Sequence, residues 1–339
     1  MLNKIPYFLV VIILFFFSSC DITKKIDKTP IALKVEDASK DQLLNEVNRF
    51  AKVGSMRAKM DFKYEDTSAA QEGSKKSFYT VNADLIVQRP ANIFLKVDVF
   101  SADLAQMTSN GENFRVAILK DDCGGRCKKF VKGTNKADYS KLQSDLKNSG
   151  SSDAKSISSF ANLRPQHFTD AILVRPTDSD STYLQSTIYQ IEEDETQKKN
   201  SPLRKVMRGY YLLDEYAKDQ NGELKISRRF WFDRVGGIHL SRQQIFDIKS
   251  EIESDIIYGS EGRLANNGEF SNLPLRIQVT RPKDKYSITF TYQSPENVTI
   301  GKNYPNTAFV LQNTWNLQEV DLDKQLQEVN SEQALINNQ

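Results

Sequence analysis

Three cysteines and two histidines are the side chains of this sequence best suited to covalent or metal chemistry. A zinc site needs four ligands, and His167 and His239 have no spacing that would complete one with Cys123 and Cys127. Both histidines are expected to be ordinary surface or partly buried residues. The sequence contains no G-x-S-x-G, H-E-x-x-H or glycine-rich phosphate loop, and no pair of carboxylates stands out as acid and base. We therefore expect neither enzymatic activity nor a cofactor.

Cys20 follows a segment with the features of a secretory signal. Lys4 gives a positive start, and residues 5–17 are almost wholly apolar but shorter than the roughly 20 residues of a membrane-spanning helix. The sequence Phe17-Ser18-Ser19-Cys20 resembles the bacterial lipobox. This resemblance implies that residues 1–19 are a signal peptide and that Cys20 becomes the lipidated first residue. The alternative is an ordinary signal peptide or an uncleaved anchor, with Cys20 incidental.

A lipid on Cys20 would fix the location of the chain. Each buried CH₂ of an acyl chain contributes about 0.8 kcal/mol, so several chains hold a protein stably on a membrane. We expect a protein of the bacterial cell envelope, anchored through Cys20 and facing the periplasm, with the outer membrane favoured over the inner one. In this oxidising compartment Cys123 and Cys127 are expected to form a disulfide across a short glycine-containing loop. A redox role is the weaker alternative, because three residues separate the thiols and no βαβ pattern surrounds them.

The composition beyond the signal is that of a globular chain with balanced charge. The 339 residues include 46 Lys plus Arg and 44 Asp plus Glu, and 39% of the residues are hydrophobic. There is no basic excess that would favour nucleic acid as a partner. The 13 Tyr and 19 Phe are a generous number, as in proteins rich in β-strands.

Helical spacing of apolar residues predicts a helix over residues 40–52, with Ser39 as its N-cap and Gly54 beyond its end. A second helix is expected over residues 165–173, and a short one is a candidate near 138–147. The tail from Leu317 is expected either as an amphipathic helix or as a frayed end.

Strict alternation of apolar and polar residues predicts strands elsewhere. It is clearest over residues 56–64, 81–87 and 93–99, and Asn110-Gly111 indicates a hairpin. The second half continues with strands joined by short turns, which gives eleven to thirteen strands and no βαβ unit. We therefore predict a mostly β (α+β) fold with one antiparallel sheet, which must curl or close because it has so many strands.

The order of these elements resembles the outer-membrane lipoprotein-sorting superfamily, the LolA/LolB-like proteins, with the mycobacterial lipid-carrying lipoproteins as relatives. The resemblance covers roughly residues 40–310. It rests on the helix after the lipobox, on the strand from Gly54 to Met60, and on the Arg89-Pro90-Ala91-Asn92 turn. Phe230-Trp231-Phe232-Asp233 before Gly236-Gly237-Ile238, and a closing hairpin from Leu273 to Tyr292, extend it.

This resemblance implies a strongly curved antiparallel sheet that forms an incomplete β-barrel, with covering helices across its open side. The domain would span residues 39–315, after a lipidated N-terminus and tether at 20–38 and before a C-terminal tail at 316–339. The enclosed apolar cavity would receive acyl chains of a lipid or lipoprotein, and the anchor on Cys20 fits an acceptor better than a free carrier.

The apolar face of the predicted strands supplies the candidate cavity lining: Met56, Met60, Phe62, Leu85, Val87, Leu95, Val97, Ile277 and Phe290. The same residues fit a packed core equally well. Two functions therefore stay open. One is an anchored protein that binds acyl chains in envelope lipid or lipoprotein transport. The other is a structural or interaction lipoprotein without a lipid cargo, which binds an envelope protein partner.

Overall fold

The computed structural model describes residues 29–67, 76–77, 80–99, 102–120, 128–137, 139, 142, 166–266 and 270–337. The chain divides into two compact units. Of the described residues, the smaller unit comprises 29–33 and Gln190–Arg208, and the larger unit comprises all the others. In the smaller unit, β1 (Ile31–Ala32) runs parallel to the start of β10, with Ile31 opposite Val206. The candidate site lies entirely within the larger unit.

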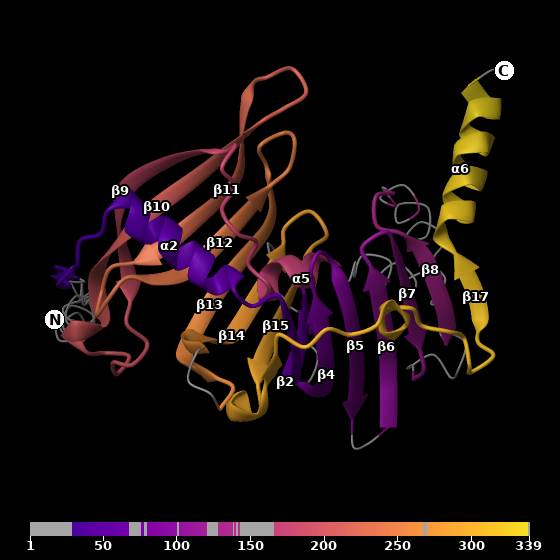
Figure 1. The fold of residues 1–339 in the computed structure, drawn as a ribbon, viewed down its shortest axis with the longest axis horizontal. Coiled ribbons are helices and arrows are strands. Elements are labelled where there is room, and N and C mark those ends of the chain that lie inside the picture. The colour runs from indigo at the N-terminus through magenta and orange to yellow at the C-terminus, as the bar shows by residue number, and fades with distance from the viewer. Residues whose placement is uncertain are drawn as a thin grey trace, which may run out of the picture. The chain divides into compact units, whose positions relative to one another are not determined.

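Long strands make up most of the structure (Figure 1). The N-terminal strands are β2 (Ser55–Asp66), β3 (Lys76–Ser77), β4 (Val81–Gln88), β5 (Asn92–Val99), β6 (Ala102–Asn110), β7 (Asn113–Ile118) and β8 (Lys129–Thr134). The later strands are β9 (Thr182–Glu193), β10 (Lys205–Lys218), β11 (Leu224–Asp233), β12 (His239–Phe246), β13 (Ile252–Leu264), β14 (Phe270–Arg281), β15 (Tyr286–Tyr292), β16 (Thr299–Ile300) and β17 (Gln318–Asp321). The α-helices are α2 (Lys40–Ala51), α5 (Gln166–Ile172) and α6 (Leu322–Asn337).

The long strands form one sheet whose order departs from the chain order at a single place in its middle. From β10 to β15 each strand pairs antiparallel with the next, and from β4 to β8 the same holds. Strand β2 lies between these two series, with Phe62 opposite Phe290 of β15 on one side and Val81 of β4 on the other. Strand β17 adds to β8 in parallel. The sheet is therefore mostly antiparallel, as predicted. Among the described residues no pairing joins its two ends, so it is not closed into a barrel.

The alternation in sequence explains which face of each strand is buried. In β2, Met56, Ala58 and Met60 are buried whereas Arg57 and Lys59 are exposed. The buried faces of the strands share one main core with Leu43, Val47 and Phe50 of α2 and with Phe168 of α5. Because side chains of a strand alternate between the faces, this core lies on one side of the sheet.

Both predicted helices near the N-terminus and in the middle of the chain are confirmed within one or two residues. Helix α2 begins with a capping box, in which the Ser39 hydroxyl accepts from Gln42 N and the Gln42 amide accepts from Ser39 N. It ends at Ala51, before Gly54. The candidate helix near residues 138–147 falls largely outside the described residues.

The C-terminal tail is helical as α6, and its Leu322 is buried in the main core. The strand count exceeds the prediction, because β1, β3, β16 and β17 are two to four residues long. Strands this short carry no readable alternation, and the partners of β1, β16 and β17 are distant in the sequence. No helix in the described ranges has both the length and the apolar character to cross a membrane.

Candidate functional site

The nine side chains predicted to line a lipid cavity lie together on the core face of the sheet. They come from β2 (Met56, Met60, Phe62), β4 (Leu85, Val87), β5 (Leu95, Val97), β14 (Ile277) and β15 (Phe290). All belong to the main core, and none is more than 7% exposed. The Phe290 ring lies 5.5 Å from that of Phe62 and 5.7 Å from that of Phe168, both edge-on. In this conformation protein side chains fill the face, and its role as a cavity stays a prediction.

Two helices lie over this face (Figure 1). Helix α2 contacts β12, and α5 contacts β4, β5 and β14. Tyr258 of β13 connects them, since its ring lies 5.9 Å from that of Phe50 in α2 and its hydroxyl donates to Ala171 O in α5 at 3.1 Å. Burial raises the pKa of Tyr258 far above its ordinary value, so the hydroxyl keeps the proton that it donates.

Arg89, in the turn between β4 and β5, binds the ends of both helices. Its Nη2 donates to Ala51 O at 3.3 Å and to Val53 O at 3.4 Å, at the end of α2. Its Nη1 donates to Leu173 O at 3.3 Å, and Nη2 also donates to Val174 O, just after α5. Carbonyls at the C-terminal end of a helix lack intrahelical donors, and a cation is favourable there. Burial lowers the pKa of Arg89.

A second arginine holds the next two carbonyls of the segment that follows α5, residues 173–177. Arg228 of β11 donates to Arg175 O and Pro176 O, each at 2.8 Å. At Thr177 the segment turns back to α2, where Asn48 accepts from Thr177 N at 3.0 Å. Four successive carbonyls of this segment are therefore bound by two guanidinium groups. The backbone after α5 is fixed by side chains from three different elements.

Arg228 itself forms a buried ion pair with Glu215 of β10. The Nη2 and Oε2 atoms are 2.5 Å apart, and the two side chains are 4% and 7% exposed. The same carboxylate accepts from the hydroxyls of Tyr183 and Ser227 at 2.7 Å each. Burial by itself raises the pKa of Glu215, but the hydrogen bonds and the charge of Arg228 outweigh it and lower the pKa below its ordinary value.

This lowered pKa predicts a specific loss of stability in acid. A carboxylate with a depressed folded-state pKa stabilises the fold above its unfolded pKa, and that contribution is lost as the pH falls through the folded-state value. We expect the difference in unfolding free energy between the wild type and Glu215→Gln to be constant above about pH 5 and to narrow below the ordinary pKa of 4.5. Urea unfolding in steps from pH 7 to pH 3 measures this difference. A difference that is the same at every pH would refute the assignment.

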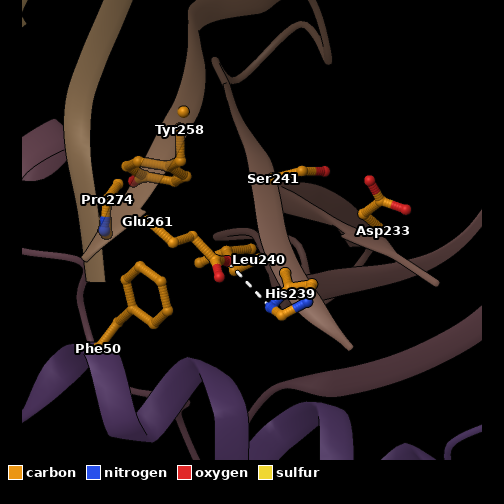
Figure 2. Close-up of a pocket in the computed structure, with 9 residues that line it drawn as sticks. Phe50, Asp233, His239, Leu240, Ser241, Tyr258, Glu261 and Pro274 are labelled. Atoms are coloured by element: carbon orange, nitrogen blue, oxygen red, sulfur yellow. Dashed lines mark ion pairs between the residues drawn. The ribbon is translucent and has the colours of Figure 1, made fainter. Parts of the chain in front are cut away.

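A pocket of about 210 Å³ opens beside α2 (Figure 2). Its wall is apolar and is formed by Phe50, Leu240, Tyr258 and Pro274, of which the first three belong to the main core. The pocket is smaller than the roughly 300–1,000 Å³ of a typical ligand site. It therefore has room for part of a ligand at the place where the core reaches the surface. It includes none of the nine residues predicted to line the cavity.

The rim of the pocket is polar and carries Asp233, His239, Ser241 and Glu261. His239 Nδ1 lies 3.0 Å from Glu261 Oε1 (Figure 2). Its Nε2 lies 3.1 Å from Gly236 O. Gly237, at φ +124°, leaves room for this ring, because a Cβ there would lie 2.8 Å from His239 Nε2. His239 is therefore partly buried, as predicted from sequence, but its position at a pocket rim was not predicted.

The remaining predicted sites fall outside the described residues. These are the signal peptide, Cys20, and the pair Cys123 and Cys127, so lipidation and the disulfide stay predictions. His167 lies half-buried on α5. Within the described ranges no group of three His, Cys, Asp or Glu side chains is placed to hold a metal ion.

No family model matches this chain, and no curated protein matches it. Among solved structures, it is similar to a LolA superfamily protein of Nitrosomonas europaea at 8% identity and a TM-score of 0.39, over 81% of this chain and 99% of that one. A DUF1329 family protein of Desulfovibrio piger is similar at 9% identity and a TM-score of 0.39, over 82% and 97% of the two chains.

An outer membrane lipoprotein-sorting protein domain of Vibrio parahaemolyticus is similar at 8% identity and a TM-score of 0.37, over 78% and 94%. The superfamily that the sequence resembles is thus among the similar structures.

Proposed function

We propose that this chain is a membrane-anchored lipoprotein of the bacterial envelope that binds acyl chains of lipids or lipoproteins on the core face beneath α2 and α5. The observation that carries the proposal is the way in which the two helices are attached. The guanidinium group of Arg89 binds carbonyl oxygens at the ends of both helices, the Tyr258 hydroxyl binds Ala171 O, and the last turn of α2 reaches the sheet through Arg49; all of these are side-chain hydrogen bonds. The helices can therefore lift from the face without breaking any pairing between strands.

Lifting the helices would uncover an apolar surface large enough to replace the environment of a membrane. The face beneath them carries Phe62, Leu95, Ile277 and Phe290, all nearly fully buried. Each CH₂ of an acyl chain gains about 0.8 kcal/mol when it leaves water for such a surface. An acyl chain has apolar surroundings both in the membrane and on this face of the protein. Its transfer between the two is therefore reversible and needs no covalent chemistry.

The predicted anchor supports the same proposal. A lipid on Cys20 would keep the protein at the membrane from which, or to which, an acyl chain moves. The pocket beside α2 supports it as well, because there the core already reaches the surface between Phe50, Leu240 and Tyr258.

The proposal is tested on the full chain carrying Cys20→Ser, by native mass spectrometry after incubation with acyl lipids or an acylated peptide. We expect one acyl-containing molecule per chain. Replacing Arg89 with methionine is expected to lower the unfolding free energy by roughly 2–3 kcal/mol. It should also tighten acyl binding by about tenfold, because the closed form that competes with the ligand is weakened.

The matched control is Arg175→Met, on the same segment. Its guanidinium makes a half-exposed ion pair with Asp170 at 3.4 Å, which is worth little. This variant should bind acyl chains as the wild type does. A wild-type chain that takes up no acyl compound at all would exclude the proposed function.

The second function, a structural or interaction lipoprotein without lipid cargo, is favoured by one observation. All nine residues predicted to line the cavity are packed in the core. This alternative predicts a mass without bound lipid for both the wild type and Arg89→Met, and retention of an envelope protein by the anchored chain.

A further inference from the structure

Gln243 is a polar residue in the middle of the apolar core face. On β12 it lies opposite Phe230 of β11 and Ile256 of β13, which are both core residues. Residues directly opposite each other in a sheet point to the same side. Its neighbour Gln244 points to the other side, where its Oε1 accepts from Trp231 Nε1 at 3.0 Å. Gln243 therefore faces the same interior as the phenylalanines beneath the helices.

The Gln243 side chain is fully buried and its hydrogen-bonding capacity is unused. Its exposed fraction is 0%, and neither Nε2 nor Oε1 has a hydrogen-bond partner among the described residues. Burying an amide without partners destabilises the fold, because its hydrogen bonds to water are lost and not replaced. An apolar side chain of the same length would avoid this cost. The core therefore contains a hydrogen-bond donor, Gln243 Nε2, and an acceptor, Gln243 Oε1, that a ligand could use.

The pocket beside α2 lies on the path to this amide. Leu240 forms part of its wall and precedes Gln243 on β12, with the extra residue of a β-bulge between them. Tyr258, also in the wall, follows Ile256 by two residues on β13. Two residues of a strand span about 7 Å, so Gln243 lies one row of side chains inward from the wall of the pocket.

We propose that Gln243 binds the carbonyl linkage of an acyl chain, with a secondary amide linkage preferred over an ester. This inference rests on the function proposed above and specifies its ligand. The Gln243 Nε2 would donate to the carbonyl oxygen of either linkage, and the amide carbonyl is the stronger acceptor of the two. The polar group next to the linkage would lie in the pocket, at the rim formed by Asp233, His239 and Glu261. The hydrocarbon chain would continue along the core face.

The test uses three probes with the same sixteen-carbon chain and the same hydroxyethyl head group, joined by an amide, an ester or an ether. Their affinities for the full chain carrying Cys20→Ser are measured by displacement of a fluorescent alkyl probe. One additional hydrogen bond is worth about 1 kcal/mol, or roughly fivefold in affinity. We expect the amide to bind more tightly than the ester, and the ester about fivefold more tightly than the ether.

Gln243→Met keeps the length of the side chain and removes both polar atoms. It should bind the three probes equally, and its melting temperature should rise by roughly 2–4 °C, because the unpaired amide is gone. Gln244→Met is the matched control on the opposite face. It should melt at a lower temperature than the wild type and keep the order amide, ester, ether.

The affinities of the three probes for the chain with Gln243 unchanged test the proposal even if a variant fails to fold. Equal binding of all three probes would overturn the role of Gln243 while leaving acyl binding intact. Binding of no probe would overturn both this inference and the proposed function. A preference for the amide that persists in Gln243→Met would assign the linkage to another residue.

Discussion

Replacing Arg228 with methionine is expected to lower the free energy of unfolding by roughly 3–5 kcal/mol. The substitution leaves Glu215 as an uncompensated charge in a site where its side chain is only 7% exposed. It also removes the donors for Arg175 O and Pro176 O, which fix the backbone after α5. Urea unfolding at pH 7 measures the loss, and amide hydrogen exchange should rise over residues 166–177 in particular.

Two further variants separate the loss of a buried ion pair from the loss of a more exposed one. Arg229→Met, on the adjacent residue, breaks an ion pair with Asp214 in which the arginine side chain is 30% exposed, and should cost no more than about 1 kcal/mol. The double variant Arg228→Met with Glu215→Leu should recover at least half of the loss, because no unpaired charge remains. Equal losses for Arg228→Met and Arg229→Met would contradict the argument.

Phe290→Ala is expected to lower the free energy of unfolding by roughly 3–5 kcal/mol as well. The ring is fully buried, and it contacts both Phe62 of the neighbouring strand and Phe168 of α5. Its removal leaves a cavity between the sheet and the helix, so the loss includes contacts as well as the transfer of the ring. Thermal and urea unfolding of the purified variant measure the loss.

The size of this loss distinguishes a filled face from one with empty space. If the face beneath α5 were an open cavity, Phe290→Ala would create no new void and would cost less than about 2 kcal/mol. Phe290→Leu, which keeps most of the volume, should cost about half as much as the alanine variant. We also expect Phe290→Ala to bind short alkanes or benzene, as dry cavities in other proteins do.

The parts of this fold that could be predicted from sequence are those whose signals are local. The alternation in β2, β4 and β5 identifies strands and their buried faces, because the period of a strand is two residues. Ser39 and Gln42 mark the start of α2, because a capping box spans only four residues. The nine apolar residues were correctly placed on one buried face, although the pattern alone could not separate a core from a cavity.

The parts that could not be predicted depend on partners that are distant in the sequence. Arg89 belongs to a recognised turn, yet nothing in the sequence links it to carbonyls after α5. Arg228 and Glu215 lie among many other charges in strands, and their burial depends on the pairing of β10 with β11. Gln243 and Gln244 are adjacent and identical, and only the bulge in β12 determines which of them faces the core.

The position of β2 in the middle of the sheet has a consequence for how the chain reaches its native state. Strands β4–β8 and β10–β15 each pair with the strand made just before them, so both series can form as soon as they are synthesised. Strand β2 can pair with β4 early, but its other edge pairs with β15, where the Tyr292 hydroxyl donates to Met56 Sδ across 236 positions of the sequence. Contacts of such long range slow folding, and an unpaired strand edge invites aggregation in the meantime. We therefore expect the chain to fold late, after the β14–β15 hairpin has been made, and an envelope protein of the kind proposed above would need a periplasmic chaperone until then.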